Sequence, residues 1–176
     1  AADEDGWTPL MIASENGHKE VCELLLDRGA SIDAADLWGA TPLNIASKQG
    51  HKEVCELLIR KGGNINVVTK GKRTLLFLAS ENGHKDVCEL LLDKGASVDT
   101  ADKDGRTLLM LASNYGHKEV CELLLDRGAR IDAADKYGWT PLMMASGNGD
   151  KKVCKLLLGR GARIDAANKN RATPLY

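Results

Sequence analysis

One phrase, repeated at a fixed spacing, constrains what this chain can fold into more than any other feature. Residues 17–30 read GHKEVCELLLDRGA, and nearly the same words return at Gly50, Gly83, Gly116 and Gly149, each 33 residues after the last. Self-similarity at such a period predicts an array of stacked repeats. Inside the phrase, apolar and charged residues follow helical rather than strand spacing. The phrase therefore predicts one helix of each repeat.

The rest of each repeat predicts a turn, a shorter helix and a second turn ahead of that phrase. Gly6 permits the first turn, Thr8 can cap a helix, and Pro9 stands at the first helical position, where its missing N–H costs nothing. Gly17 separates the two helices, and Gly29 ends the second in a left-handed cap. The repeats are predicted at 3–35, 36–68, 69–101, 102–134 and 135–167, and a partial sixth at 168–176.

This repeated sequence pattern resembles the ankyrin repeat. The matching phrases are GWTPLMIA, GATPLNIA and GWTPLMMA in the first half of the repeat, GH after it, and LLLDRGA at its end. The resemblance covers essentially the whole chain. It implies an all-α solenoid in which L-shaped helix-turn-helix units stack, β-hairpin-like tips project sideways, and a curved array presents a concave binding face.

Several repeats depart from the consensus sequence of the family. The usual His of TPLH is replaced by Met11, Asn44, Phe77, Met110 and Met143. In the third repeat, Thr69 replaces Asp, Lys72 replaces the turn Gly and Leu75 replaces Pro. A residue with a side chain at a positive-φ position costs about 1–2 kcal/mol. We therefore expect the turn at residues 70–73 to be remodelled and the third repeat to be the weakest.

The charge balance gives no global attraction to nucleic acid or to an anionic membrane, because 24 Lys and Arg face 25 Asp and Glu. We expect no nucleic-acid partner. There is also no long apolar run and no signal-peptide pattern, so we expect no membrane insertion, and we interpret the chain as a soluble piece of a longer array or an engineered chain.

Cysteine and histidine each recur at one phase of the repeat. The five cysteines are too far apart, on neighbouring packed helices, for disulfides between neighbours, and we expect them reduced, in the core and in an intracellular setting. The histidines could form a metal ladder, but no Cys or carboxylate pattern completes a tetrahedral site. We favour imidazole bonds to neighbouring loop backbone, with Asp150 of the fifth repeat as a helix cap, and expect no metal.

Nothing in the sequence indicates catalysis. It has no nucleophile elbow, no phosphate-binding glycine loop and no zinc-protease motif, and its carboxylates recur with the framework instead of forming a differentiated acid and base. We predict no enzyme and no cofactor.

The variable positions of the repeat lie at the predicted tips. All three tryptophans and two of the three tyrosines stand there or at the end of a first helix, and such side chains dominate binding hot spots. The alternative is that each ring only packs on the adjacent tip. The predicted partner-binding residues are Asp5, Trp7, Leu37, Trp38, Lys70, Arg73, Asp104, Arg106, Tyr115, Lys136, Tyr137 and Trp139.

Three classes of function remain open at this point. The first is a monomeric, non-catalytic module that binds a partner protein on its concave face, with aromatic patches as anchors and the central cations for orientation. The second is recognition of a phosphorylated or nucleotide-like ligand at Lys70–Arg73, with a base stacked on Trp38 or Tyr137. The third is a structural spacer in a longer scaffold. An engineered ankyrin-repeat binder is also compatible with variation focused on the tips.

Overall fold

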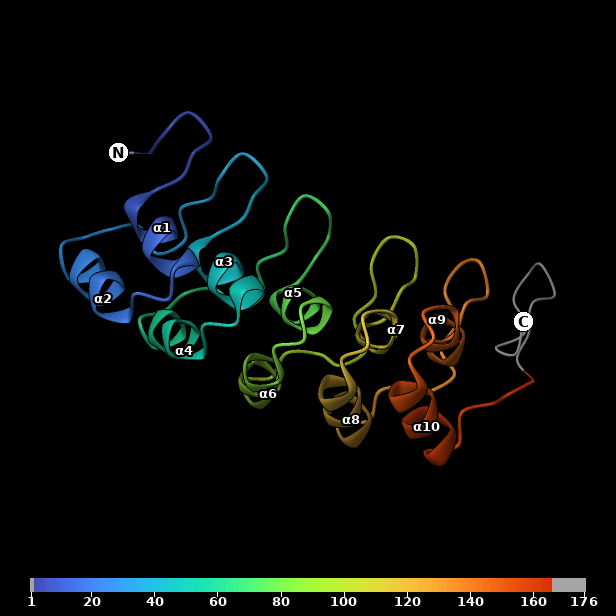
Figure 1. Ribbon diagram of the computed structural model, residues 1–176. Helices are drawn as coiled ribbons and strands as arrows, with labels where there is room; N and C mark the ends of the chain where they lie inside the picture. The colour runs from blue at the N-terminus through green and yellow to red at the C-terminus, as the bar shows by residue number, and fades with distance from the viewer. Residues whose placement is uncertain (1, 166–176) are drawn as a thin grey trace. The chain divides into compact units, whose positions relative to one another are not determined.

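Each of the five full repeats contains a first helix of seven or eight residues and a second helix of nine in the computed structural model, which describes residues 2–165 (Figure 1). The first helices are α1 Pro9–Glu15, α3 Pro42–Gln49, α5 Leu75–Glu81, α7 Leu108–Asn114 and α9 Pro141–Gly147. The second helices are α2 Lys19–Asp27, α4 Lys52–Arg60, α6 Lys85–Asp93, α8 Lys118–Asp126 and α10 Lys151–Gly159. Within the described residues, β pairing is limited to isolated bridges, one of which joins Val68 to Thr74. The predicted all-helical repeat fold is confirmed.

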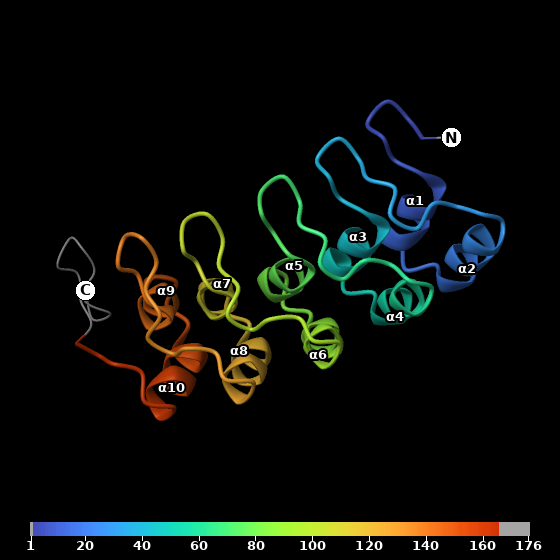
Figure 2. The ribbon, with the colours of Figure 1, turned by 180° about the vertical axis from the view of Figure 1, so that it is seen from behind.

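The contacts of the chain group it into two compact units. Of the described residues, the first unit comprises 2–79 and 86–96, and the second comprises 80–85 and 97–165. In the first unit, α1 packs on α2 and α3, and α4 packs on both as well; in the second, α7 and α10 pack on α8 and α9 in the same way. Within each unit the tips project on the side of the first helices, as both views show (Figures 1 and 2).

The first helices begin as the sequence predicts, with a threonine cap. The hydroxyl oxygen of Thr8 accepts the backbone N–H of Met11 at 3.3 Å, and Pro9 stands at the start of the helix. The residue that replaces the family's His makes the reciprocal hydrogen bond back to the threonine. Met11 Sδ accepts the backbone N–H of Thr8 at 3.4 Å, and Asn44 Oδ1 accepts the backbone N–H of Thr41 at 2.9 Å. The N–H groups of Thr8, Thr41 and Thr107 therefore keep an acceptor without an imidazole.

The histidines at the start of the second helices connect consecutive repeats. Nε2 of His117 lies 3.0 Å from the carbonyl oxygen of Glu81, in the preceding repeat. His18, His51 and His117 precede their helices without a side-chain capping bond. Asp150, which replaces His in the fifth repeat, caps α10 by accepting the backbone N–H groups of Lys152 and Val153. The observations on His117 and Asp150 agree with the roles expected of these two residues.

The cysteines pack where the two helices of a repeat meet. All five are free thiols, and four are fully buried, whereas Cys154 is half-buried. Each of the four contacts recorded pairs a thiol with a serine of the first helix, as for Ser47 Oγ and Cys55 Sγ at 3.6 Å. Burial raises the pKa of Cys55 and of Cys121 to about 12, because a thiolate would lose its hydration there.

The third repeat keeps the turn that its sequence was expected to lose. Lys72 adopts a φ of 58°, in the left-handed region, and it is the one residue other than glycine with positive φ among those described. The backbone N–H of Thr69 still bonds the carbonyl of Arg73 at 3.1 Å, as Asp36 bonds Ala40 at 3.0 Å in the second repeat. The expectation of a remodelled turn is therefore wrong, because the backbone bonds of the tip hold Lys72 in a strained conformation.

The helices of residues 2–165 have at most nine residues. No stretch of the described chain forms a helix that is long and apolar enough to cross a membrane.

Candidate protein-binding surface

A carboxylate at the start of the tip fixes the backbone on which the variable residues stand. In the second repeat, Asp36 Oδ1 accepts the N–H groups of Trp38 at 2.9 Å and Ala40 at 2.7 Å. In the fifth, Asp135 Oδ1 accepts those of Tyr137 and Trp139, both at 2.8 Å. Because these bonds are made by the main chain of the variable positions, the aromatic side chains can change without disturbing the tip. The tips are therefore preorganised.

Neighbouring tips within a unit are joined through their main chains. In the first unit, the N–H of Leu37 donates to the carbonyl of Asp5 and that of Lys70 donates to the carbonyl of Trp38, each at 3.1 Å. In the second unit, the N–H of Lys136 donates to the carbonyl of Asp104 at 3.0 Å. The predicted contact residues other than Tyr115, which is the C-cap of α7, thus stand on bonded tips.

Most of the predicted contact residues are accessible. Trp38 is 57% exposed, Tyr137 54% and Tyr115 53%, values that are high for side chains of this size. The exposed residues of the predicted set are Asp5, Leu37, Trp38, Lys70, Tyr115, Lys136 and Tyr137, and the half-buried ones are Trp7, Arg73, Asp104, Arg106 and Trp139.

The first unit brings two of its three predicted apolar contacts together at a pocket. The pocket has a volume of about 310 Å³, and Trp7, Trp38 and Arg73 from three successive tips line it with Ile45 of α3. Leu37, which directly precedes Trp38, is exposed but does not line the pocket. The two tryptophans of the predicted first patch are therefore joined.

The second unit brings two of its three predicted rings together in the same way. Tyr137 and Trp139 line a pocket of about 370 Å³ with Asn114 and Asn148, at the ends of α7 and α9. Tyr115 is not among the lining residues, because its ring stacks on the imidazole of His117, with centroids 6.2 Å apart.

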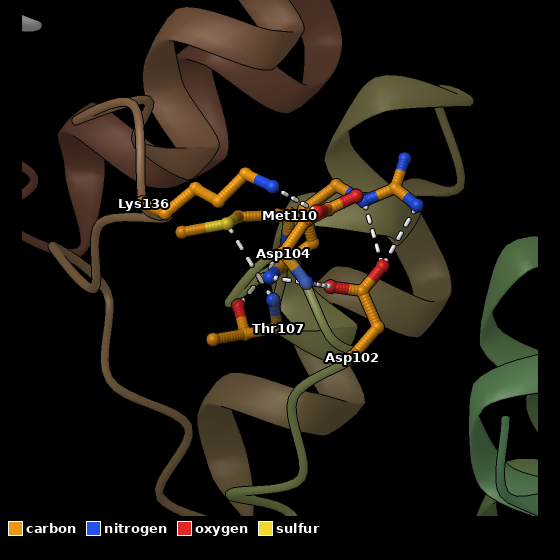
Figure 3. A network of polar contacts seen from close by, with 6 residues as sticks. Asp102, Asp104, Thr107, Met110 and Lys136 are labelled. Carbon is orange, nitrogen blue, oxygen red and sulfur yellow. Dashed lines mark hydrogen bonds and ion pairs between the residues drawn. The ribbon is translucent and has the colours of Figure 1, made fainter. Parts of the chain in front are cut away.

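Two cations of the second unit are held by tip carboxylates, Lys136 by Asp104 of the preceding tip and Arg106 by Asp102 of its own tip. Figure 3 shows Lys136 reaching across to Asp104, while Asp102 accepts the backbone N–H groups of Asp104 and Arg106 in its own tip. Arg106 binds Asp102 through two nitrogens, at 2.8 and 2.7 Å. The hydrogen bond from Lys136 lowers the pKa of Asp104 and raises the pKa of Lys136 itself. These two cations are therefore neutralised locally.

Asn44 is a residue of this surface that the sequence analysis did not place there. It lines the pocket of the first unit although it is only 1% exposed, and its Nδ2 is the one buried side-chain nitrogen or oxygen without a hydrogen-bond partner among the described residues. The available signal was its polarity, because the other four repeats have Met or Phe at this position.

The described part of the chain contains no group of three or more His, Cys, Asp and Glu side chains that could hold a metal ion.

Comparison with known families agrees with this arrangement. A family model for ankyrin repeats in three copies matches residues 32–102 and 76–168, and a model for the single ankyrin repeat matches residues 5–37. A search of curated proteins gives no match. Because the family models together account for residues 5–168, the chain belongs to the ankyrin-repeat family.

Proposed function

We propose that the chain is a non-catalytic binding module that holds a partner protein on its tips and first helices, the concave face of the predicted array. Ankyrin repeats are in general protein-protein interaction modules without catalytic activity. The observation that carries the proposal is the exposure of large rings, Trp38 at 57% and Tyr137 at 54%, on tips fixed by backbone hydrogen bonds. Rigid exposed aromatics lose little conformational entropy when a partner covers them.

The proposed contact surface has a share in each unit. Trp7, Trp38 and Arg73 meet at the pocket of the first unit, with Asp5, Leu37 and Lys70 on the same tips. Tyr137 and Trp139 meet at the pocket of the second, with Asp104, Arg106, Tyr115 and Lys136 near them in the chain. We propose that the rings supply the affinity and that the charged residues set orientation and association rate.

Alanine substitution of the rings tests the proposal. A partner is captured from lysate, identified and purified, and its affinity is measured for the wild type, Trp38→Ala and Trp139→Ala. At least one substitution should cost about 2–4 kcal/mol of binding free energy. Leu24→Ala is the matched control, because Leu24 is 54% exposed but lies on α2, away from the tips. Unchanged affinity in both Trp variants, with the fold intact, would refute the tip surface.

Recognition of a phosphorylated or nucleotide-like ligand at Lys70–Arg73 is the alternative. The guanidinium of Arg73 already lies 5.5 Å from the centroid of the Phe77 ring, so a phosphate would compete with that ring for the cation. Affinity that falls steeply with salt would favour the phosphate ligand, whereas contacts made mainly by rings predict a weak dependence.

We propose further that the chain is monomeric, acts as one continuous array over residues 1–176, and works inside the cell. The five free thiols support the last point, because disulfides form and persist in oxidising compartments. Sedimentation of the isolated protein and localisation of a tagged full-length protein test these statements separately.

A further inference from the structure

Asn44 occupies a position where the fold does not require a polar side chain. The corresponding residues Met11, Phe77, Met110 and Met143 are all buried and apolar. Methionine also accepts the N–H of the capping threonine, as Met11 Sδ does from Thr8 at 3.4 Å. The helix start therefore tolerates an apolar residue here, and the amide of Asn44 needs another explanation.

The amide of Asn44 is only half satisfied. Its Oδ1 accepts the N–H of Thr41 at 2.9 Å and the hydroxyl of Thr41 at 3.0 Å. Its Nδ2 is buried and has no partner, and burying an unpaired donor costs free energy that methionine would not cost. An unpaired donor at a buried position that lines a pocket indicates a ligand that brings a hydrogen-bond acceptor.

The remaining walls of the pocket define the chemistry of that ligand. Trp7, Trp38 and Ile45 offer apolar surface, and the pocket, at about 310 Å³, is at the small end of ligand sites, with room for one or two side chains. The charged lining residues balance, because Glu15 and Asp36 are acidic while Lys48 and Arg73 are basic. A ligand without net charge that carries carbonyl groups and one large apolar group fits this lining.

We propose that the pocket of the first unit binds an extended peptide segment of the partner, with an apolar side chain against Trp7 and Trp38 and a main-chain carbonyl accepting from Asn44 Nδ2. The inference rests on the proposed function and specifies it, since it names the form of the partner segment and the residue that selects it. Asn44 thereby acts as a recognition residue that the free protein keeps at the expense of its own stability.

The test uses a phage-displayed library of random peptides selected against the full chain. Enriched peptides are synthesised, and their affinities are measured for the wild type, Asn44→Met and Trp38→Ala. We expect Asn44→Met to bind roughly tenfold or more weakly, because the peptide carbonyl loses its donor, and to melt at a higher temperature than the wild type. Trp38→Ala should also weaken binding. Leu24→Ala is the matched control and should bind as the wild type does, because Leu24 is 54% exposed but lies on α2 and does not line this pocket.

A direct readout on the unmodified protein keeps the test decisive if a variant fails to fold. In a ¹⁵N-edited spectrum, the side-chain amide of Asn44 should shift when peptide is added. Equal affinity of wild type and Asn44→Met, no shift of this amide, enrichment of no peptide, or loss of binding in Leu24→Ala but not in Trp38→Ala would each overturn the inference. The proposed function fails separately, when a folded partner binds all the Trp variants as it binds the wild type.

Discussion

Nε2 of His51 lies 2.8 Å from the carbonyl oxygen of Glu15, in the preceding repeat. The ring can take this place because Gly17 has no side chain: a Cβ added there would lie 2.6 Å from Nδ1 of His51. The bond satisfies a carbonyl at the end of α1, where no further helical partner is available. A glycine and a histidine 34 residues apart thus form one element of the interface between repeats.

Gly17→Ala should therefore destabilise the protein more than the same change at Gly149. Gly17 and Gly149 have φ of 71° and 70°, so an alanine suffers similar backbone strain at both, about 1–2 kcal/mol. Only Gly17 faces an imidazole, since nothing lies within 4 Å of a Cβ added at Gly149. The displaced ring should add about 1–3 kcal/mol at Gly17. Urea denaturation of the two variants measures the difference.

A double variant checks the cause. If the extra cost comes from the ring, Gly17→Ala combined with His51→Ala should lose less stability than the sum of the two single changes. Additive losses would show that the ring moves aside freely.

Lys72→Gly should stabilise the third repeat. Lys72 holds a φ of 58°, which costs a residue with a side chain about 1–2 kcal/mol, while glycine gives back about 0.5–1 kcal/mol in chain entropy. The expected net gain is about 0.5–1 kcal/mol, measured as a higher denaturation midpoint. Gly39→Lys is the reverse change at the same tip position, with ordinary contacts around the added Cβ, and should lose stability. A loss in Lys72→Gly would show that the lysine side chain stabilises the tip.

The third repeat should also exchange its amide hydrogens first. Its tip lacks the carboxylate that holds the others, because Thr69 stands where Asp36 accepts two N–H groups in the second repeat. Local opening at low free energy exposes the bonded amides of such a segment to solvent. Hydrogen exchange resolved by residue tests this prediction. It is wrong if the amides of residues 69–81 are the best protected of the array.

The fold was predictable because its determinants recur at one phase of every repeat. The Thr-Pro pair begins α1, α3 and α9 of the described chain, and the cysteine of each second helix is buried in four repeats out of five. The buried positions are fixed by helical spacing and by stacking, both of which are properties of the chain itself. One sequence was enough for this part.

The candidate site was less predictable, because it depends on which side chains meet between repeats. Tyr115 stacks on His117 instead of lining the pocket with Trp139, and Arg106 turns to Asp102. The orientation of these side chains depends on their rotamers and local partners, which a residue's position within the repeat does not determine. Asn44 was missed for a further reason. A polar residue at a repeat position that is otherwise apolar shows its function only when the hydrogen-bond partners of its side chain are known.

Raising the pH above about 9 should destabilise the protein through its buried thiols. The pKa of Cys55 and of Cys121 is raised from 9.0 to about 12 in the native state, so between these values the unfolded chain releases protons that the native chain keeps. This stability is fully present below about pH 9 and is lost as the pH rises toward 12. From about pH 8 to about pH 10, each thiol should cost roughly 1.4 kcal/mol of unfolding free energy.

Urea denaturation at the two pH values measures this loss, and a variant with both Cys55→Ala and Cys121→Ala corrects for lysines and tyrosines that titrate in the same range. The variant is less stable overall, since each change opens a small cavity, but its stability should fall by about 3 kcal/mol less between the two pH values than that of the wild type.

Thiol labelling of the native protein gives an independent check. Cys154 is half-buried and should react first, while Cys55 and Cys121 should wait for unfolding. An equal pH dependence in both proteins, together with rapid labelling of Cys55, would mean that these thiols ionise in the native state.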